Sequence, residues 1–171
     1  MKASEITQKV RLIVSDADSV VYTLDEMEGW LREAMDALIL LRPEANTVTE
    51  IMELDKGSTQ IVPDGVIRLQ SVLCNVTPDG GGGYDEGRSV RLTERRIYDQ
   101  FDPDWRKQTQ KKEVREYFMD QESPREMHVF PPNDGTGALR VRVSRVPEIS
   151  DLDSDPDFPV EASYAPAIVD W

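Results

Sequence analysis

The side chains that could carry catalysis are few in this sequence. His128 is the only histidine and Cys74 the only cysteine. A Ser-His-Asp or Cys-His group would have to use His128 as its base, and no residues around it complete such a group. Cys74 lies in the apolar run 69–76, where a buried and unreactive thiol is expected. We therefore expect no catalytic residues and no enzymatic activity.

Metal binding also lacks a complete set of ligands. The aspartates at alternate positions from 151 to 157 resemble the start of a calcium-binding loop. Such a loop needs glycine at its sixth position and glutamate at its twelfth, where this chain has Pro156 and Ala162. A transition metal would require more histidine or cysteine than the chain offers. We expect no metal and no cofactor.

The glycine-rich segment 78–87 is the other stretch that could bind a ligand. It contains Gly80, Gly81, Gly82 and Gly83 in a row. No Gly-Lys-Ser/Thr follows, and no strand-to-helix junction frames the glycines, so this is not a phosphate-binding loop. We expect a flexible surface loop.

Charge is distributed unevenly along the 171 residues, which carry a net charge of −13. Residues 1–87 carry 7 basic and 16 acidic side chains, and residues 88–115 carry 9 and 5. Residues 148–171 carry 7 acidic side chains and no basic ones. A free DNA-binding protein would present a basic stripe. The strong acidic excess of this chain therefore argues against DNA binding as its function.

Three interpretations of this pattern remain open. The acidic excess is a matter of solubility, or the acidic tail repels DNA from a surface, or the tail of one copy meets the basic middle of another. The last predicts electrostatic contacts between subunits. Its candidate residues are Arg95, Arg96, Arg106 and Lys107 on one side and Asp151, Asp153 and Asp155 on the other.

The N-terminal third predicts a pair of helices. Apolar residues recur at helical spacing in residues 4–14. Thr23 and Glu26 form a capping box for a second helix, which Pro43 ends. Trp30 lies on the apolar face of that helix and is expected in the core.

Residues 47–147 read mainly as strands. Period-two patterns predict strands over 47–54 and 66–76, with 59–62 pairing back as a short strand. One central helix follows Thr93, its expected cap. Strands over 114–119, 127–130 and 139–146 are expected to form an antiparallel meander, with Val141 and Val143 on its dry face and arginines on the other.

The last residues form an acidic linker and a short helix. We therefore expect an α+β domain over 1–147 and an acidic linker with a C-terminal helical arm over 148–171. Tyr164, Ile168 and Trp171 form an apolar edge expected at an interface. For Trp105, core and interface both remain open. The final helix reaches Trp171 without a C-cap, so either a partner buries this short helix or the natural chain continues, and we favour the second. Neither a signal peptide nor a membrane span is predicted.

The whole chain resembles the head-to-tail adaptor (connector) proteins of tailed bacteriophages. Each motif is weak alone, but their order extends along nearly the full length. The residues that carry the resemblance are Trp30-Leu31, residues 40–45, Gly57, Gln60, Pro63, Leu69, Val72, Asn75, Val90-Arg91-Leu92, Asp102-Pro103-Asp104-Trp105, Tyr117, Asp120, Phe130-Pro131-Pro132 and residues 164–170.

This resemblance implies a structural virion protein made in the host cytoplasm and located at the head–tail junction. Such proteins form a ring, typically twelvefold, between the portal protein and a tail or nozzle protein. DNA passes through the lumen without specific binding, and the glycine loop 80–83 is expected to face the tail. The alternatives are another tail-completion component, such as a tail terminator or nozzle subunit, and a small metal-dependent phage hydrolase.

Overall fold

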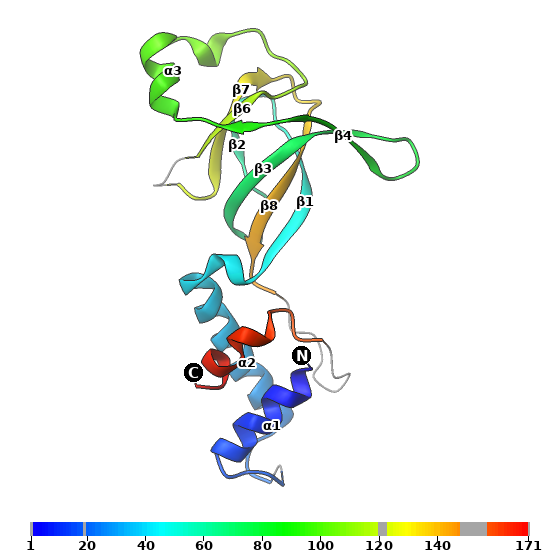
Figure 1. Cartoon of the computed structure of the whole chain (residues 1–171), viewed down its shortest axis with the longest axis vertical. Helices are drawn as coiled ribbons and strands as arrows, with labels where there is room; N and C mark the ends of the chain where they lie inside the picture. Colours follow the sequence, from blue (N-terminus) through cyan, green and yellow to red (C-terminus); the bar gives the residue numbers. More distant parts are fainter. Residues whose placement is uncertain (1, 19, 120–122, 148–156, 171) are drawn as a thin grey trace. The chain divides into compact units, whose positions relative to one another are not determined.

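The chain divides into two compact units (Figure 1). The computed structural model describes residues 2–18, 20–119, 123–147 and 157–170. A helical unit contains residues 1–46 and 145–171, and a β unit contains residues 47–144. The chain therefore enters and leaves the β unit once, and both of its ends belong to the helical unit. The division predicted from the sequence, with a boundary after residue 147, stays a prediction.

The helical unit is built on two helices, α1 (Ala3–Ile13) and α2 (Leu24–Leu41). The predicted capping box starts α2: the Thr23 hydroxyl accepts from the Glu26 N–H at 3.3 Å, and the Glu26 carboxylate accepts from the Thr23 N–H at 2.9 Å. A short turn, η1 (Pro43–Ala45), follows α2. The C-terminal elements η4 (Ala162–Tyr164) and α4 (Ala165–Val169) complete the unit, and α4 packs on both long helices.

Trp30 is not in the core, contrary to the prediction. Its side chain is 40% exposed and contacts the Tyr22 ring edge-on at 5.1 Å between centroids. The buried apolar positions of α2 are Met27, Leu31, Ala34, Met35, Leu38 and Ile39. Trp30 is adjacent to this stripe and lines an apolar groove of the helical unit.

The β unit contains two four-stranded sheets, in the orders β1-β8-β3-β4 and β2-β7-β6-β5. The first contains β1 (Thr47–Glu53), β3 (Val66–Pro78), β4 (Tyr84–Ser89) and β8 (Ala138–Arg145). The second contains β2 (Gly57–Ile61), β5 (Arg91–Leu92), β6 (Glu116–Met119) and β7 (Glu126–Asn133). One hydrophobic cluster takes residues from both sheets, among them Met52, Leu69, Tyr117, Val129 and Val141.

Two predicted strand pairings are wrong, although the strands themselves exist. β2 pairs with β7 in the second sheet instead of returning to β1, and β8 leaves the predicted meander to pair with β1. Of the pairings in the predicted meander, the antiparallel pairing of β6 with β7 is present. Period-two patterning fixes which side chains are buried but not the partner strand, because either sheet offers the same dry face. Val141 and Val143 are fully buried, as predicted.

A buried amide holds the start of the segment that leads into β6. Asn75 of β3 donates to the Val114 carbonyl at 2.8 Å and accepts from the Val114 N–H at 2.8 Å. It also donates to the Arg88 carbonyl at 2.9 Å. Because buried backbone groups need partners, this one side chain satisfies both polar groups of Val114. The α+β class with N-terminal helices and a C-terminal helix, as predicted, is confirmed.

Candidate interaction surfaces

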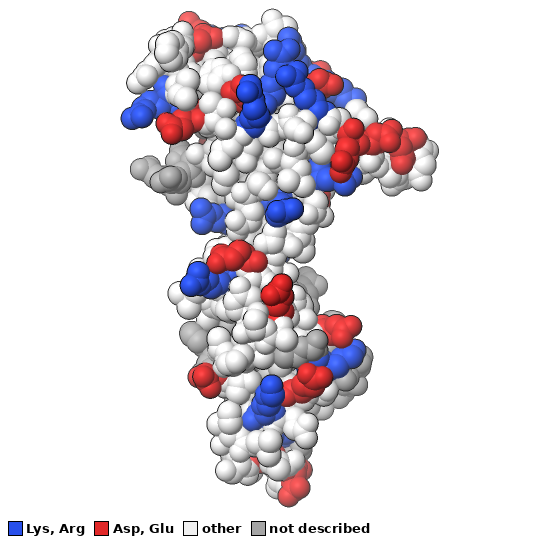
Figure 2. Space-filling view, viewed as in Figure 1, with Lys and Arg blue, Asp and Glu red and all other residues white. Residues whose placement is uncertain are grey.

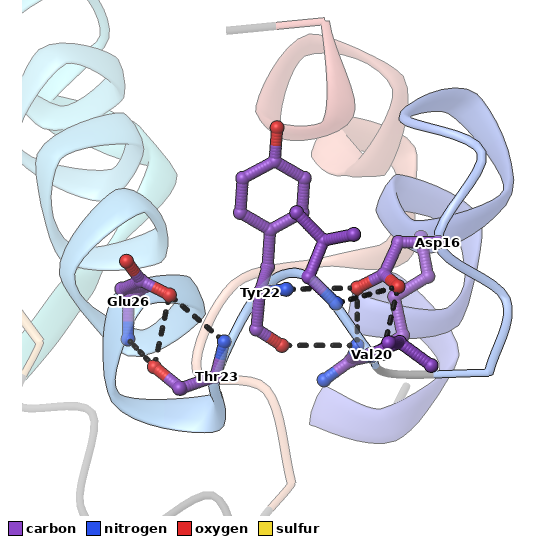
Figure 3. A network of polar contacts seen from close by, with 7 residues as sticks. Asp16, Val20, Tyr22, Thr23 and Glu26 are labelled. Atoms are coloured by element: carbon purple, nitrogen blue, oxygen red, sulfur yellow. Dashed lines mark hydrogen bonds and ion pairs between the residues drawn. The ribbon is translucent and has the colours of Figure 1, made fainter.

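The connection between α1 and α2 is organised by one carboxylate (Figure 3). Asp16 is 4% exposed and accepts hydrogen bonds from the backbone N–H groups of Val20 (2.8 Å), Val21 (3.0 Å) and Tyr22 (3.0 Å). Arg11 forms an ion pair with it at 3.2 Å. These bonds to the charged form, first that from the Tyr22 N–H, hold the pKa of Asp16 below its ordinary value.

The loop that Asp16 fixes presents apolar side chains to solvent. Val20 is 81% exposed and Val21 is 67% exposed. The rest of the helical unit also exposes apolar side chains to solvent. Ten of the fifteen large apolar side chains that are exposed in the described chain belong to it, so this unit, more than the β unit, has apolar surface left for a partner to cover. They are Leu12, Ile13, Val14, Val20, Val21, Leu24, Trp30, Leu40, Leu41 and Val146.

The C-terminal residues predicted at an interface occupy different environments. Ile168 is 4% exposed and packs within the helical unit, because α4 lies against α1 and α2. Tyr164 is half-buried. Trp171 lies outside the described residues. Ile168 therefore offers little free surface itself, although together with Val169 it lines an apolar groove of this unit.

The short helix α3 (Arg95–Phe101) is held on the β unit by its inner face. Tyr98 donates to Glu116 of β6 at 2.9 Å, and its ring contacts Phe118 at 5.1 Å and Phe130 at 4.6 Å. Burial, followed by the bond to Glu116, raises the pKa of Tyr98 to about 12. Thr93 does not cap the helix as predicted, but donates to the same Glu116 carboxylate at 2.9 Å.

Trp105, in the turn η2 (Trp105–Lys107), is a core residue in this structure. It is 0% exposed, and its indole N–H donates to Asp99 at 2.9 Å. That bond is the main reason why the pKa of Asp99 is lowered. The sequence left core and interface open, and assigning Trp105 to an interface does not fit a side chain with no exposed surface. The Tyr98 and Phe118 rings enclose it because the Pro103 turn folds η2 back onto the sheet.

The outer face of α3 carries exposed apolar residues that the sequence analysis did not single out. Phe101 is 85% exposed and Ile97 is 45% exposed. Residues four apart lie on the same side of a helix, so the two side chains form one apolar strip. The sequence carries no direct signal for this exposure, because an apolar residue at helical spacing is expected to be buried.

The predicted basic residues gather around this helix and the following turn. Arg95, Arg96, Arg106 and Lys107 are all exposed, and Figure 2 shows a cluster of Lys and Arg at the top of the β unit, to the right of the place where Figure 1 draws α3. Their proposed counterparts Asp151, Asp153 and Asp155 lie outside the described residues. The ion pairs of the basic residues are Arg95–Asp99 (3.1 Å), Arg96–Glu94 (3.8 Å), Arg106–Asp99 (3.4 Å) and Lys107–Asp104 (2.6 Å).

The glycine segment forms the tip of the β3–β4 hairpin. Asp79 accepts from the N–H groups of Gly81 (2.7 Å) and Gly83 (2.9 Å), which closes the turn. Gly80 and Gly82 have φ of +78° and +91°, where glycine is favoured. The predicted loop is too long at its far end, because Tyr84–Ser89 forms strand β4 on β3. β4 was missed because its residues are polar. A strand at the edge of a sheet can be polar, since it needs no buried face.

The two residues first considered for catalysis, His128 and Cys74, are both buried. His128 is buried with its Nδ1 3.1 Å from the Thr59 hydroxyl. Cys74 is buried, and burial raises the pKa of its thiol. Within the described residues, no three His, Cys, Asp or Glu side chains lie together as metal ligands would. None of the described helices has both the length and the apolar character needed to cross a bilayer.

Comparison with known proteins agrees with the resemblance noted in the sequence. A search of curated proteins found no match to this chain. The model of the family described as SU10 adaptor protein matches residues 1–171, the whole length. The expected membership in a phage adaptor family is confirmed, and the chain belongs to the SU10 adaptor protein family.

Proposed function

We propose that this protein is a structural subunit of a ring, expected to be twelvefold, that joins the portal of a tailed phage to its tail or nozzle. The main observation behind this proposal is the family match over the whole chain. The distribution of apolar surface supports it. A helical unit that leaves ten large apolar side chains exposed is suited to burial against neighbours in an assembly.

Charge supports the passage of DNA through the ring. Residues 1–46 and 145–171, the helical unit, carry 6 basic and 16 acidic side chains. Phosphates bind to surfaces rich in lysine and arginine, so an acidic wall would let DNA slide without holding it. The β3–β4 hairpin tip with Gly80–Gly83 is the part we assign to the tail side, since a closed glycine turn can approach another backbone closely.

The experiment is a phage whose gene for this protein is interrupted, examined by electron microscopy. We expect DNA-filled heads and separate tails, with joining restored when the protein is supplied from a plasmid. Averaged images of the complete particle should place the protein between portal and tail. Normal joining without the protein would refute the adaptor role, and a location at the far end of the tail would identify a nozzle component instead.

A further inference from the structure

The helical unit contains an apolar groove that its own residues leave open. The groove has a volume of about 300 Å³ and lies between α1, α2 and α4. Ile13 at its edge is 63% exposed and Val14 is 38% exposed, so the lining is accessible from solvent. Its lining residues are Thr7, Val10, Ile13, Val14, Met27, Trp30, Leu31, Glu33, Ala34, Ile168 and Val169.

The charge around this groove narrows its possible occupants. Glu33 is the one charged residue in the described lining, and the unit as a whole carries ten more acidic than basic residues. Two such units would repel each other if they met face to face. The best occupant is therefore an apolar side chain or pair of side chains presented with arginine or lysine beside it.

The β unit of the same chain presents that chemistry. Phe101 and Ile97 form the exposed apolar strip of α3, and Arg96, whose side chain is 80% exposed, lies next to Ile97 in the sequence. The inner face of α3 is fixed by Tyr98 and Glu116, so the strip is presented without a large ordering cost. A groove of this volume has room for a phenylalanine and an isoleucine side chain.

We propose that the outer face of α3, with Phe101 and Ile97, docks into the apolar groove of the helical unit of a second copy. This rests on the proposed function and names the contact between its neighbouring subunits. Glu33 at the groove would then face the arginines at the start of α3, so apolar burial and charge favour the same orientation.

The contact is heterologous, because the two patches differ and lie on different units of the chain. A pair of copies that uses one such contact leaves one free groove and one free α3 strip. Each end can therefore add a further copy, and the chain of copies closes if the rotation between neighbours allows it. An isologous pair would have no free ends.

The test begins with two charged substitutions on exposed residues, Phe101→Asp and Ile13→Asp. Each should weaken self-association of the purified protein by at least about tenfold, as loss of an interface anchor does. Ile61→Asp is the matched control, since Ile61 on β2 is 67% exposed and belongs to neither patch. Light scattering gives the masses, and circular dichroism checks that each variant is folded.

Mixing the two defective variants gives the decisive measurement. Phe101→Asp keeps an intact groove and Ile13→Asp keeps an intact α3 strip, so the mixture should form a complex of two chains and nothing larger. A double variant with Ile13→Cys and Phe101→Cys has one cysteine in each patch, so oxidation should give a ladder of crosslinked oligomers. The natural Cys74 is buried and should not take part.

Failure of this contact can be told apart from failure of the adaptor role. A protein that oligomerises and joins heads to tails while Phe101→Asp behaves like the Ile61→Asp control would overturn the contact alone. Mixed variants that do not pair would do the same. A wild-type protein that remains monomeric up to millimolar concentration would also overturn it. Heads and tails that join without this protein overturn the adaptor role, whatever the variants do.

Discussion

Replacing Trp105 tests whether the β unit depends on this side chain as the structure indicates. The indole has no exposed surface and contacts Tyr98, Phe118 and His128 edge-on. Truncating a fully buried tryptophan to alanine costs about 3–5 kcal/mol of unfolding free energy. Trp105→Ala should therefore lower the melting temperature of the β unit by at least about 12 °C, using about 4 °C per kcal/mol for a domain of this size.

A second variant separates the contribution of packing from that of the hydrogen bond. Trp105→Phe keeps an aromatic ring but loses the N–H that donates to Asp99. Asp99 retains its ion pairs with Arg95 and Arg106, so the cost should be near that of one hydrogen bond, about 1 kcal/mol, together with a small cavity.

Urea unfolding followed by far-ultraviolet circular dichroism measures both variants. The expected order of stability is wild type, then Trp105→Phe, then Trp105→Ala. If Trp105→Ala loses less than about 1 kcal/mol, the residue is not the anchor of α3 and η2, and the assignment to the core is wrong. In that case the interface alternative from the sequence returns.

Further predictions concern the helical unit. Trp30→Ala should cost about half as much as Trp105→Ala, roughly 1.5–2.5 kcal/mol in the same assay, because Trp30 is 40% exposed; an equal cost would contradict its placement. Thr23→Ala removes the capping box of α2 and should cost about 1 kcal/mol, while Thr23→Ser should restore most of the loss. Asp16→Asn should speed hydrogen exchange at the amides of residues 20–22, since an amide group directs N–H toward groups that are themselves donors. The pKa of Asp16 is lower in the folded chain than in the unfolded one, so its stabilising effect is complete above the unfolded value of about 4 and is lost as the pH falls through the folded value. Acid titration of thermal stability checks this sign: Asp16→Asn should lose less stability between neutral and acidic pH than the wild type, and an equal loss would mean that Asp16 is not coupled to folding.

Local signals in the sequence predicted local structure well. The pairing of Thr23 with Glu26 identified the start of α2 because a capping box acts within four residues. Val141 and Val143 were placed on a dry face because period two is a property of one strand. Strand partners could not be derived in the same way. β8 pairs with β1, which lies about ninety residues away in the sequence. Both sheets offer β8 an apolar face, so its partner strand is decided by the packing of the shared core.

The interaction surfaces show the same division. The basic character of α3 and η2 was visible in the sequence, but the exposure of Phe101 was not, because an apolar residue at helical spacing is expected to be buried. Its exposure follows from Tyr98, which occupies the inner face of a helix with room for one apolar strip. Trp105 was ambiguous for the same reason, and the turn after Asp102 brought it inward.

The two kinds of force at the proposed contact should respond differently to salt, and this difference tests whether both act. Apolar burial of Phe101 is not screened by ions, whereas attraction between the acidic helical unit and the arginines of α3 falls off over a Debye length of about 8 Å at physiological ionic strength. Raising salt should therefore slow association more than it speeds dissociation. For Arg96→Glu, association should be slower than in the wild type at low salt, and the difference should shrink as salt rises. The defect of Phe101→Asp should persist at high salt, because the loss of apolar burial cannot be screened. If salt removed the defect of Phe101→Asp as well, the groove would be an electrostatic site and its apolar lining would need another occupant.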